Sequence, residues 1–379
     1  MKILIVSPVY PPDFGVTTFR IKSIREALET EHTVDVLKLG DCTDLRENSL
    51  TIKRSLVYSL PYAILNRPKL GRILRSVVKR YDLIIVSATP YGIYEVARLA
   101  IRQNVPVILD LRDLPDLTTS EQKGLKPEWW LNLKCCLIMR YIVKIAWNCE
   151  GLMCVGQIAT SIMQKRLQKS SCMVLNVHNG FNRDDIQFSI GHFKNEMVPK
   201  PNLLIGCVGN IYRFRDTHEL RRVLKKISCF KKPTEIRHWG SITSSLLDYI
   251  NSLPNIIYRR ETPLSREHLL GRLSAFDCYL LPCSEDLIWE PTTSVFDYIL
   301  FDKPIIFAGM RNNEAFSIIE KSRRTVIFEE HLDVIENNSF PINCEPRSLD
   351  DYYSREFQVS KLFQIIQIIK HKNRLNKKV

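Results

Sequence analysis

The stretch NLLIGCVGN, residues 202–210, is an apolar run that ends in a polar turn, and it begins a pattern that the chain has already followed once. The first residues of the chain, KILIVS at 2–7, are a run of the same kind. After each of them, short β-branched runs alternate with longer amphipathic ones, as in βαβ units with parallel sheets. A pattern that starts twice predicts an α/β chain of two tandem Rossmann-like domains.

The same alternation predicts the individual elements. Strands are expected in the first half at 2–7, 33–39, 83–88, 106–111, 151–156 and 172–177, and in the second half at 202–210, 234–240, 255–260, 277–283, 304–309 and 324–330. Helices are expected at 17–29, 92–103, 216–228, 243–252, 265–274, 293–301, 313–321 and 354–370.

A polar segment at 183–201 with two prolines is typical of an interdomain linker. We therefore expect one domain at 1–190, a second at 191–353 and a terminal helix within 354–379. Ligands of doubly wound sheets bind outside the carboxyl ends of the strands. Two such domains predict a ligand cleft between them, lined by the loops that follow the strands.

Composition and charge restrict the class of protein. The 379 residues are 45% hydrophobic and 25% charged, which is an ordinary soluble composition. The first residues lack the features of a signal peptide, and no stretch reaches the ~18 apolar residues of a spanning helix, so we expect a cytoplasmic protein. The 11 cysteines include no CxxC motif, which disfavours a zinc or disulfide framework. The net charge of +13 indicates an anionic partner.

The loop after the first strand, SPVYPPDFGVTTFR at 7–20, starts a helix. It holds a single glycine, Gly15, where a dinucleotide site needs GxGxxG, so a nicotinamide site is disfavoured. Gly15 either shapes the rim of the cleft or belongs to a stiff connection.

The fourth predicted strand runs into LDLRDLPD at 109–116. This stretch carries three charged residues, Asp110, Arg112 and Asp113. Charges at the end of an apolar strand are costly unless they face a polar cleft or pair with each other. These residues therefore either orient an acceptor hydroxyl or form a structural ion pair between Arg112 and Asp113.

VGNIYRFRDTHEL at 208–220 follows the first strand of the second half. Arg213 and Arg215 precede a predicted helix, whose amino end carries free amides and a partial positive charge. Arginines and helix amides together suit a diphosphate. Loop arginines are often only solvated, but the position at a strand end favours a ligand, and Arg215 above all.

PCSEDLIWEPTTSVFDYILFDKP at 282–304 contains a helix start at Pro291, Thr292 and Thr293. Asp297 then lies in the first or second turn of that helix. A carboxylate beside a phosphate site does not bind phosphate, but it can accept hydrogen bonds from sugar hydroxyls, and the positive end of the helix keeps it ionised.

At these residues the second half resembles the donor domain of the retaining GT-B glycosyltransferases of family 4, which move sugars from nucleotide donors to polysaccharide and lipid-linked acceptors. Asp297 and the following FDKPII match the acid and the GKPVI turn of that family. Asn210 and Arg215 match its arginine–lysine pair in part. Similar stretches are NGF at 179–181, RLSAFDCYLLPC at 272–283 and the SREF helix at 354–357.

The chain departs from the family at three positions. The first of the two family glutamates falls on Trp289, beside Glu290, while Asp297 takes the place of the second, which holds the donor ribose. The family histidine after the fourth strand falls on Arg112, and the arginine of the phosphate pair falls on Asn210.

The resemblance implies a GT-B fold with an interdomain cleft, an acceptor-side first domain, a donor-binding second domain and a C-terminal helix that packs back on the first. It implies retention at the anomeric carbon, no metal, and no cofactor beyond the nucleotide-diphosphate sugar as co-substrate. Arg215 and Asp297 are the expected catalytic residues. The expected donor-binding residues are Gly209, Asn210, Arg213, Arg215, Glu290, Thr292, Thr293 and Asp297. The acceptor-side residues are Gly15, Asp110, Arg112 and Asp113.

The segment 53–80 holds eight basic residues and no acidic one, interleaved with tyrosines and aliphatic residues. It is either a solvated helix face or a surface that rests on an anionic bilayer. The second interpretation places the protein at the inner face of a membrane.

We therefore predict a hexosyl- or N-acetylhexosaminyl-transferase that acts on a glycan or polyprenyl-diphosphate-linked acceptor in bacterial surface polysaccharide synthesis. Two alternatives remain, a nucleotide-sugar epimerase of the same fold and a non-catalytic GT-B-like binding subunit. An epimerase needs carboxylates and histidines that face the cleft, and the eight histidines show no such cluster. A nucleic-acid binder is disfavoured, because the basic residues lie on no recognition element.

Overall fold

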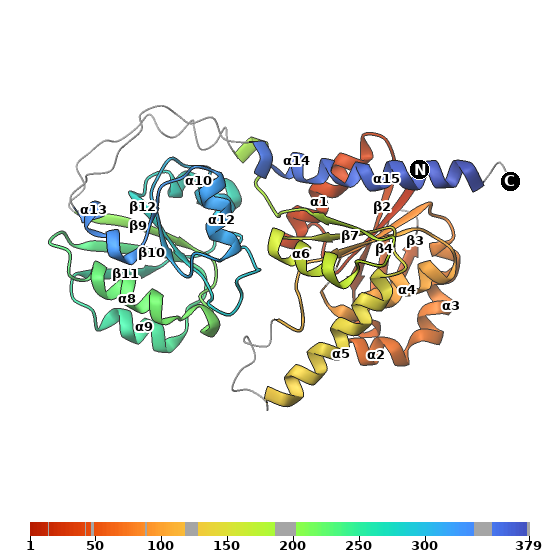
Figure 1. Ribbon diagram of the computed structural model, residues 1–379, viewed down its shortest axis with the longest axis horizontal. Helices are drawn as coiled ribbons and strands as arrows, with labels where there is room; N and C mark the ends of the chain where they lie inside the picture. Colours follow the sequence, from red (N-terminus) through yellow and green to blue (C-terminus); the bar gives the residue numbers. More distant parts are fainter. Residues whose placement is uncertain are drawn as a thin grey trace. The chain divides into compact units, whose positions relative to one another are not determined.

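The computed structural model describes residues 1–13, 15–41, 43–46, 49–87, 89–117, 128–185, 202–336 and 351–376. The chain divides into two compact units (Figure 1). Unit 1 comprises Met1–Asn179 and Arg355–Val379, and unit 2 comprises Gly180–Ser354. Most of the predicted linker at 183–201 lies outside the described residues. Each unit is an α/β layer structure on a sheet that is parallel except for the edge strand β3, so the predicted fold class is confirmed.

Unit 1 is built on an eight-stranded sheet in the order β3-β4-β2-β1-β5-β6-β7-β8. Its strands are β1 (Lys2–Ser7), β2 (Thr33–Gly40), β3 (Asp44–Arg46), β4 (Ser49–Lys53), β5 (Leu83–Ser87), β6 (Val107–Leu111), β7 (Gly151–Cys154) and β8 (Met173–Asn176). The six predicted strands are present, and all of them pair in parallel. The short strands β3 and β4 were not predicted because their residues are largely polar. β4 pairs in parallel with β2, and β3 pairs antiparallel with β4 at the edge of the sheet.

The helices of unit 1 include two that come from the end of the chain. They are α1 (Val16–Glu29), η1 (Arg54–Leu56), α2 (Leu60–Leu65), α3 (Arg67–Val78), η2 (Tyr91–Ile93), α4 (Tyr94–Arg102), α5 (Glu128–Ala146), α6 (Gln157–Arg166), α14 (Arg355–Ser360) and α15 (Leu362–Asn376). Leu362, Ile366 and Ile369 share one apolar core with the strand residues Ile3 and Ile5. The C-terminal helix therefore packs on the first unit, as expected.

Unit 2 is a six-stranded parallel sheet in the order β11-β10-β9-β12-β13-β14. Its strands are β9 (Leu203–Val208), β10 (Thr234–Trp239), β11 (Ile256–Arg260), β12 (Cys278–Pro282), β13 (Ile305–Ala308) and β14 (Val326–Ile327). Its helices are η4 (Arg213–Arg215), α8 (His218–Ile227), α9 (Ser244–Asn251), α10 (Arg266–Leu273), α11 (Val295–Tyr298), α12 (Glu314–Lys321), η5 (Glu329–His331), α13 (Asp333–Glu336) and η6 (Asp351–Tyr353). One apolar core lies on each face of the sheet.

The helix predicted at 293–301 is much shorter in the structure. Only Val295–Tyr298 is α-helical. The amides of Val295, Phe296 and Asp297 each bond to the carbonyl three residues earlier, and the amide of Phe301 does the same. The segment is thus a tight turn at both ends, and Asp297 still lies in its first turn.

The strand order reverses direction in each unit at one point, between β1 and β5 in unit 1 and between β9 and β12 in unit 2. Ligands of doubly wound sheets bind outside the carboxyl ends of the strands at such points. The loops after β1 and β5 in unit 1, and after β9 and β12 in unit 2, are therefore the places to look for a site.

Candidate nucleotide-sugar site

Tyr298 marks the switch point of unit 2. β12 pairs with β9 only at Cys278↔Ile205 and Tyr279↔Gly206. Beyond that point the Tyr298 hydroxyl accepts from the Val208 amide at 2.6 Å and lies 3.2 Å from the Leu280 carbonyl, to which it donates. Burial raises the pKa of Tyr298 well above its ordinary value, so the phenol stays a neutral donor. It bridges the two strands where their backbones diverge.

The loop after β9 depends on Gly209. Its φ of +103° is in a region that side-chain-bearing residues rarely adopt. If Gly209 carried a Cβ, the nearest atom to it would be Ser294 Oγ, at 4.0 Å. A Cβ on Gly240 would lie 2.2 Å from the Gly209 carbonyl oxygen, so both glycines are needed for this close approach.

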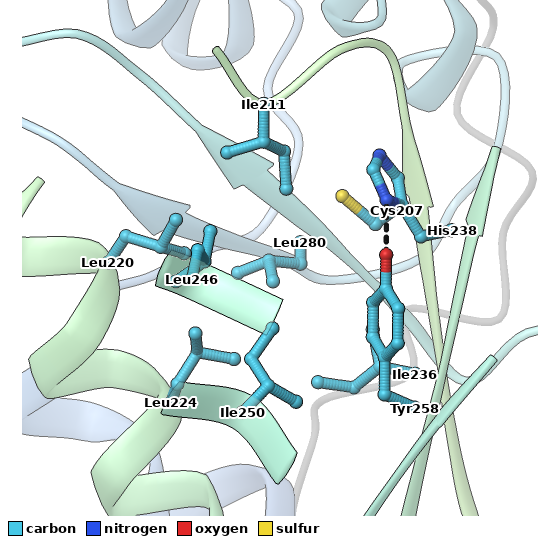
Figure 2. Close-up of a pocket in the computed structure, with 10 residues that line it drawn as sticks. All are labelled: Cys207, Ile211, Leu220, Leu224, Ile236, His238, Leu246, Ile250, Tyr258 and Leu280. Atoms are coloured by element: carbon cyan, nitrogen blue, oxygen red, sulfur yellow. Dashed lines mark hydrogen bonds between the residues drawn. The ribbon is translucent and has the colours of Figure 1, made fainter. Parts of the chain in front are cut away.

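His238, which the sequence analysis did not identify, supports the same loop. Its Nε2 lies 2.7 Å from the Gly209 carbonyl oxygen. Its Nδ1 lies 2.7 Å from the Tyr258 hydroxyl (Figure 2). Burial lowers the pKa of His238, which favours the neutral ring. Because a carbonyl can only accept, Nε2 carries the proton, and the Tyr258 hydroxyl donates to Nδ1.

A small cavity lies behind this support, between the sheet and helices α8 and α9. Figure 2 shows the side chains that line it, which are Cys207, Ile211, Leu220, Leu224, Ile236, His238, Leu246, Ile250, Tyr258 and Leu280. The volume of the cavity is about 10 Å³, close to the lower limit for one water molecule. The cavity is a packing void within the core and is too small for a nucleotide.

Arg215 and Glu290 meet at the switch point. Arg215 Nη2 lies 3.9 Å from Glu290 Oε1, and Arg215 Nη1 donates to the Asn210 carbonyl at 3.1 Å. The guanidinium also lies over the Phe214 ring at 5.6 Å. Asn210 in turn accepts the Ser241 amide through Oδ1. The structure therefore brings together Asn210, Arg215 and Glu290, whereas the side chain of Arg213 lies outside the described part.

Thr292 joins this group through Cys283. Burial is the main reason that the pKa of the Cys283 thiol is raised to about 12; Glu290 raises it further, whereas Arg215 and Thr292 lower it. Thr292 is buried and Thr293 is half-buried, in the turn that leads into α11. The predicted donor-binding residues Gly209, Asn210, Arg215, Glu290 and Thr292 thus surround one strand end of unit 2.

Asp297 belongs to a buried ion cluster that the sequence analysis did not anticipate. Arg266, the first residue of α10, donates through Nη1 to Asp297 at 2.5 Å and through Nη2 to Asp185 at 3.0 Å. Burial lowers the pKa of Arg266, but Asp297 and Asp185 outweigh this and raise it overall. One guanidinium thus bridges two carboxylates, and Arg266 orients Asp297.

In unit 1 the carboxylate of Asp110 is fully buried and forms an ion pair with Arg20 at 2.7 Å. It also accepts a hydrogen bond from Ser87 at 2.8 Å. Asp110 therefore holds β6, β5 and α1 together from inside the unit. Neither interpretation from the sequence named Arg20, which lies 90 residues away from its partner in the chain.

The other acceptor-side residues lie near the start of α1. Arg112 Nη1 donates to Thr17 Oγ1 on the first turn of α1, which begins after Gly15. Within the described part of the chain, Arg112 Nε is buried without a hydrogen-bond partner. Burial raises the pKa of Asp113, while Arg112 lowers it. Gly15, Arg112 and Asp113 therefore remain candidates at the switch point of unit 1.

Two searches within the described residues bear on metals and membranes. No group of three or more His, Cys, Asp and Glu side chains there is arranged to hold a metal ion. In the same residues, no helix combines the length and the apolar character that crossing a bilayer requires.

Known structures share this architecture at low sequence identity. HepE of Anabaena, solved with UDP and glucose, has a TM-score of 0.56 at 15% identity over 100% of both chains. A glycosyltransferase of Rickettsia africae has a TM-score of 0.60 at 14% identity over 97% of this chain and 98% of its own. The UDP-GlcNAc 2-epimerase of Neisseria meningitidis, bound to UDP-GlcNAc, has a TM-score of 0.55 at 12% identity over 97% of this chain and 100% of its own. No protein-family model and no curated protein matches the chain.

The chain therefore has the two Rossmann-like domains of the GT-B fold, which glycosyltransferases and nucleotide-sugar 2-epimerases share. At these identities the similarity shows the fold alone.

Proposed function

We propose that the protein is a glycosyltransferase of the GT-B class, of the retaining family 4 type, that binds a nucleotide-diphosphate sugar at the switch point of unit 2. The observation that carries the proposal is the group formed by Gly209, Arg215 and Glu290 at the carboxyl end of β9. A left-handed glycine lets a ligand approach the backbone, and a partly buried arginine supplies the charge that a diphosphate needs.

Arg215 has the main chemical role in this proposal. Its ion pair with Glu290 has a distance of 3.9 Å, which is long for a strong ion pair. A diphosphate would give the guanidinium better partners, and the charge that develops on the leaving nucleotide would be stabilised by it. We propose that this stabilisation of the leaving nucleotide needs no metal ion.

Asp297 is proposed to accept hydrogen bonds from the hydroxyls of the donor. Its contact with Arg266 supports this role indirectly, because a buried carboxylate that is held by a fixed arginine has a defined orientation. Thr292, Thr293 and the side chain of Arg213 complete the proposed donor site.

The acceptor is proposed to bind in unit 1, near Gly15, Arg112 and Asp113. Arg112 supports this with its buried Nε, a donor without a partner among the described residues. We propose a glycan or a polyprenyl-diphosphate-linked acceptor, reached from the cytoplasmic side of a membrane during bacterial surface polysaccharide synthesis.

Epimerisation of the nucleotide sugar is the second candidate, because a UDP-GlcNAc 2-epimerase has the same fold. The two reactions are separated by their products. A transferase releases a nucleoside diphosphate, whereas an epimerase converts UDP-GlcNAc to its 2-epimer with the nucleotide intact. A subunit that has lost the chemistry would bind a nucleotide sugar and do neither.

The test is a thermal-stabilisation screen of nucleoside diphosphates and their sugars. A ligand at 100 times its dissociation constant adds roughly 2.7 kcal/mol, so a true donor raises the unfolding temperature clearly. Arg215→Ala should weaken binding of the free nucleoside diphosphate by roughly 1.5 to 3 kcal/mol, measured by calorimetry. Arg259→Ala, on the edge strand β11, is the matched control and should bind normally. If no nucleotide stabilises the protein, the proposed function is wrong.

A further inference from the structure

The first half of α5 presents a row of large apolar side chains to solvent. Trp129, Trp130, Leu133 and Leu137 are all exposed, Trp129 by 68%. Within 129–137 only Leu131 is buried. Figure 1 shows this end of α5 extending beyond the other helices on its side of unit 1.

The row lies along one side of the helix. Trp129, Leu133 and Leu137 are spaced by four residues, and such positions share a face. Further along the same face come Arg140 and Lys144, both exposed. The face is therefore apolar for about 12 Å at its start, at 1.5 Å per residue, and basic beyond.

A second exposed apolar group lies on a neighbouring element. Tyr58, Tyr62 and Leu65, in and before α2, are exposed, Leu65 by 78%. The buried carboxylate of Glu95 on α4 links this region to α5. It accepts a hydrogen bond from Nη2 of Arg67 at 2.8 Å, and Arg67 lies two residues after Leu65. It also accepts a hydrogen bond from the hydroxyl of Tyr141 on α5. Leu137 lies one helical turn before Tyr141, so the two apolar groups are held on the same side of unit 1.

The surroundings of these groups are basic. Exposed basic residues are Lys53, Arg54, Lys69, Arg72, Arg75, Lys79 and Arg80 in 53–80, and Lys134, Arg140 and Lys144 on α5. The segment 53–80 contains no acid, and the sequence of α5 contains one, Glu128. A surface that joins exposed tryptophans, tyrosines and leucines to positive charge complements a bilayer with anionic headgroups.

We propose that the first half of α5, together with α2, enters the interfacial layer of an anionic bilayer, while the basic residues of α3 rest on the headgroups. The predicted surface at 53–80 then supplies most of the charge and, through α2, part of the apolar anchor, whereas the rest of the anchor lies outside it on α5. Arg67 takes no part, because Glu95 binds it. An amphipathic segment of this kind sits about 5–10 Å into the headgroup region. What the docked protein acts on rests on the proposed function, but the docking itself does not.

The experiment measures partition of the full chain into vesicles of phosphatidylcholine with and without phosphatidylglycerol. Wild-type protein should co-sediment with the anionic vesicles and be released at high salt. Its fluorescence should be quenched by lipids brominated on the acyl chain, because Trp129 and Trp130 would then lie beside the lipid. Of the five tryptophans, Trp239 and Trp289 are buried in the protein and out of reach of the quencher.

Trp129→Ser combined with Trp130→Ser should weaken partition at least tenfold and abolish quenching. Trp147→Ser is the matched control, since it removes an exposed tryptophan just beyond the other end of α5, and it should stay within twofold of wild type. Leu133→Ser with Leu137→Ser is a second variant that should also weaken partition. Lys69, Arg72 and Arg75 changed together to glutamate should remove binding at low salt.

Each contrary result has a distinct meaning. If the tryptophan variant partitions like wild type, α5 is not the anchor. If wild type ignores anionic vesicles and forms a dimer that the tryptophan variant loses, the face binds a second copy and the membrane proposal is wrong. Both results leave nucleotide binding to be judged by the thermal screen.

Discussion

Replacing Arg266 with methionine removes the cation that separates two buried carboxylates. The side chains of Arg266, Asp297 and Asp185 are 19%, 10% and 6% exposed, so water can compensate only a little. Methionine keeps much of the aliphatic length of arginine without its charge. The variant therefore tests the electrostatic contribution of the cluster more than its packing.

The expected loss of stability follows from the two contacts. A hydrogen bond to a charged group contributes about 1.5 to 3 kcal/mol, and breaking a buried ion pair costs about 3 to 5 kcal/mol. Arg266 keeps some contact with solvent, so the lower end of this range applies, and we expect about 3 kcal/mol. The control is Arg183→Met, which breaks the exposed ion pair with Asp351 in the same unit and should cost about 0 to 1 kcal/mol.

Urea unfolding followed by tryptophan fluorescence suits this test. Trp239 and Trp289 are buried in unit 2, whereas Trp129, Trp130 and Trp147 of unit 1 are exposed. The change in fluorescence on unfolding therefore reports mainly on unit 2, which matters because a chain of two units need not unfold in one step. A loss no larger than that of the Arg183 control would refute the claim that Arg266 holds Asp297 in place.

Three further changes test other parts of the structure. Asp297→Asn should keep the fold within about 1 to 2 kcal/mol but lose most turnover of a donor sugar, and full activity would contradict the sugar contact. Gly240→Ala should cost about 1 to 3 kcal/mol and weaken nucleotide binding, because the new Cβ meets the Gly209 carbonyl; Gly71→Ala, with nothing within 4 Å, is the control. Burial lowers the pKa of Lys361 to about 8, below the roughly 10.4 of an unfolded lysine, so the folded protein binds fewer protons between these values and its stability rises with pH there. Lys361 lies in unit 1, so urea unfolding is followed here by circular dichroism, and Lys361→Met should lack that rise between pH 8 and pH 10.

The sequence alone determined the layers of the fold. Apolar β-branched runs predicted every strand of unit 2 and the central strands of unit 1, because a parallel sheet buried on both faces leaves its pattern in consecutive residues. The same local pattern placed Arg215 after β9 and Asp297 at a helix start. It gave no bounds for α5, whose exposed tryptophans and leucines obscure the helical period of its buried residues.

Only the tertiary structure decided which side chains act together. Arg20 meets Asp110 across 90 residues, Arg266 meets Asp185 across 81, and His238 reaches Gly209 across 29. Periodicity reports the burial of a position and not the identity of its partner, because an ion pair or a hydrogen bond forms through space after the strands have been ordered. The sequence could therefore name Asp110 and Asp297 as charged residues in unusual places, while the structure was needed to show the arginine that each one binds.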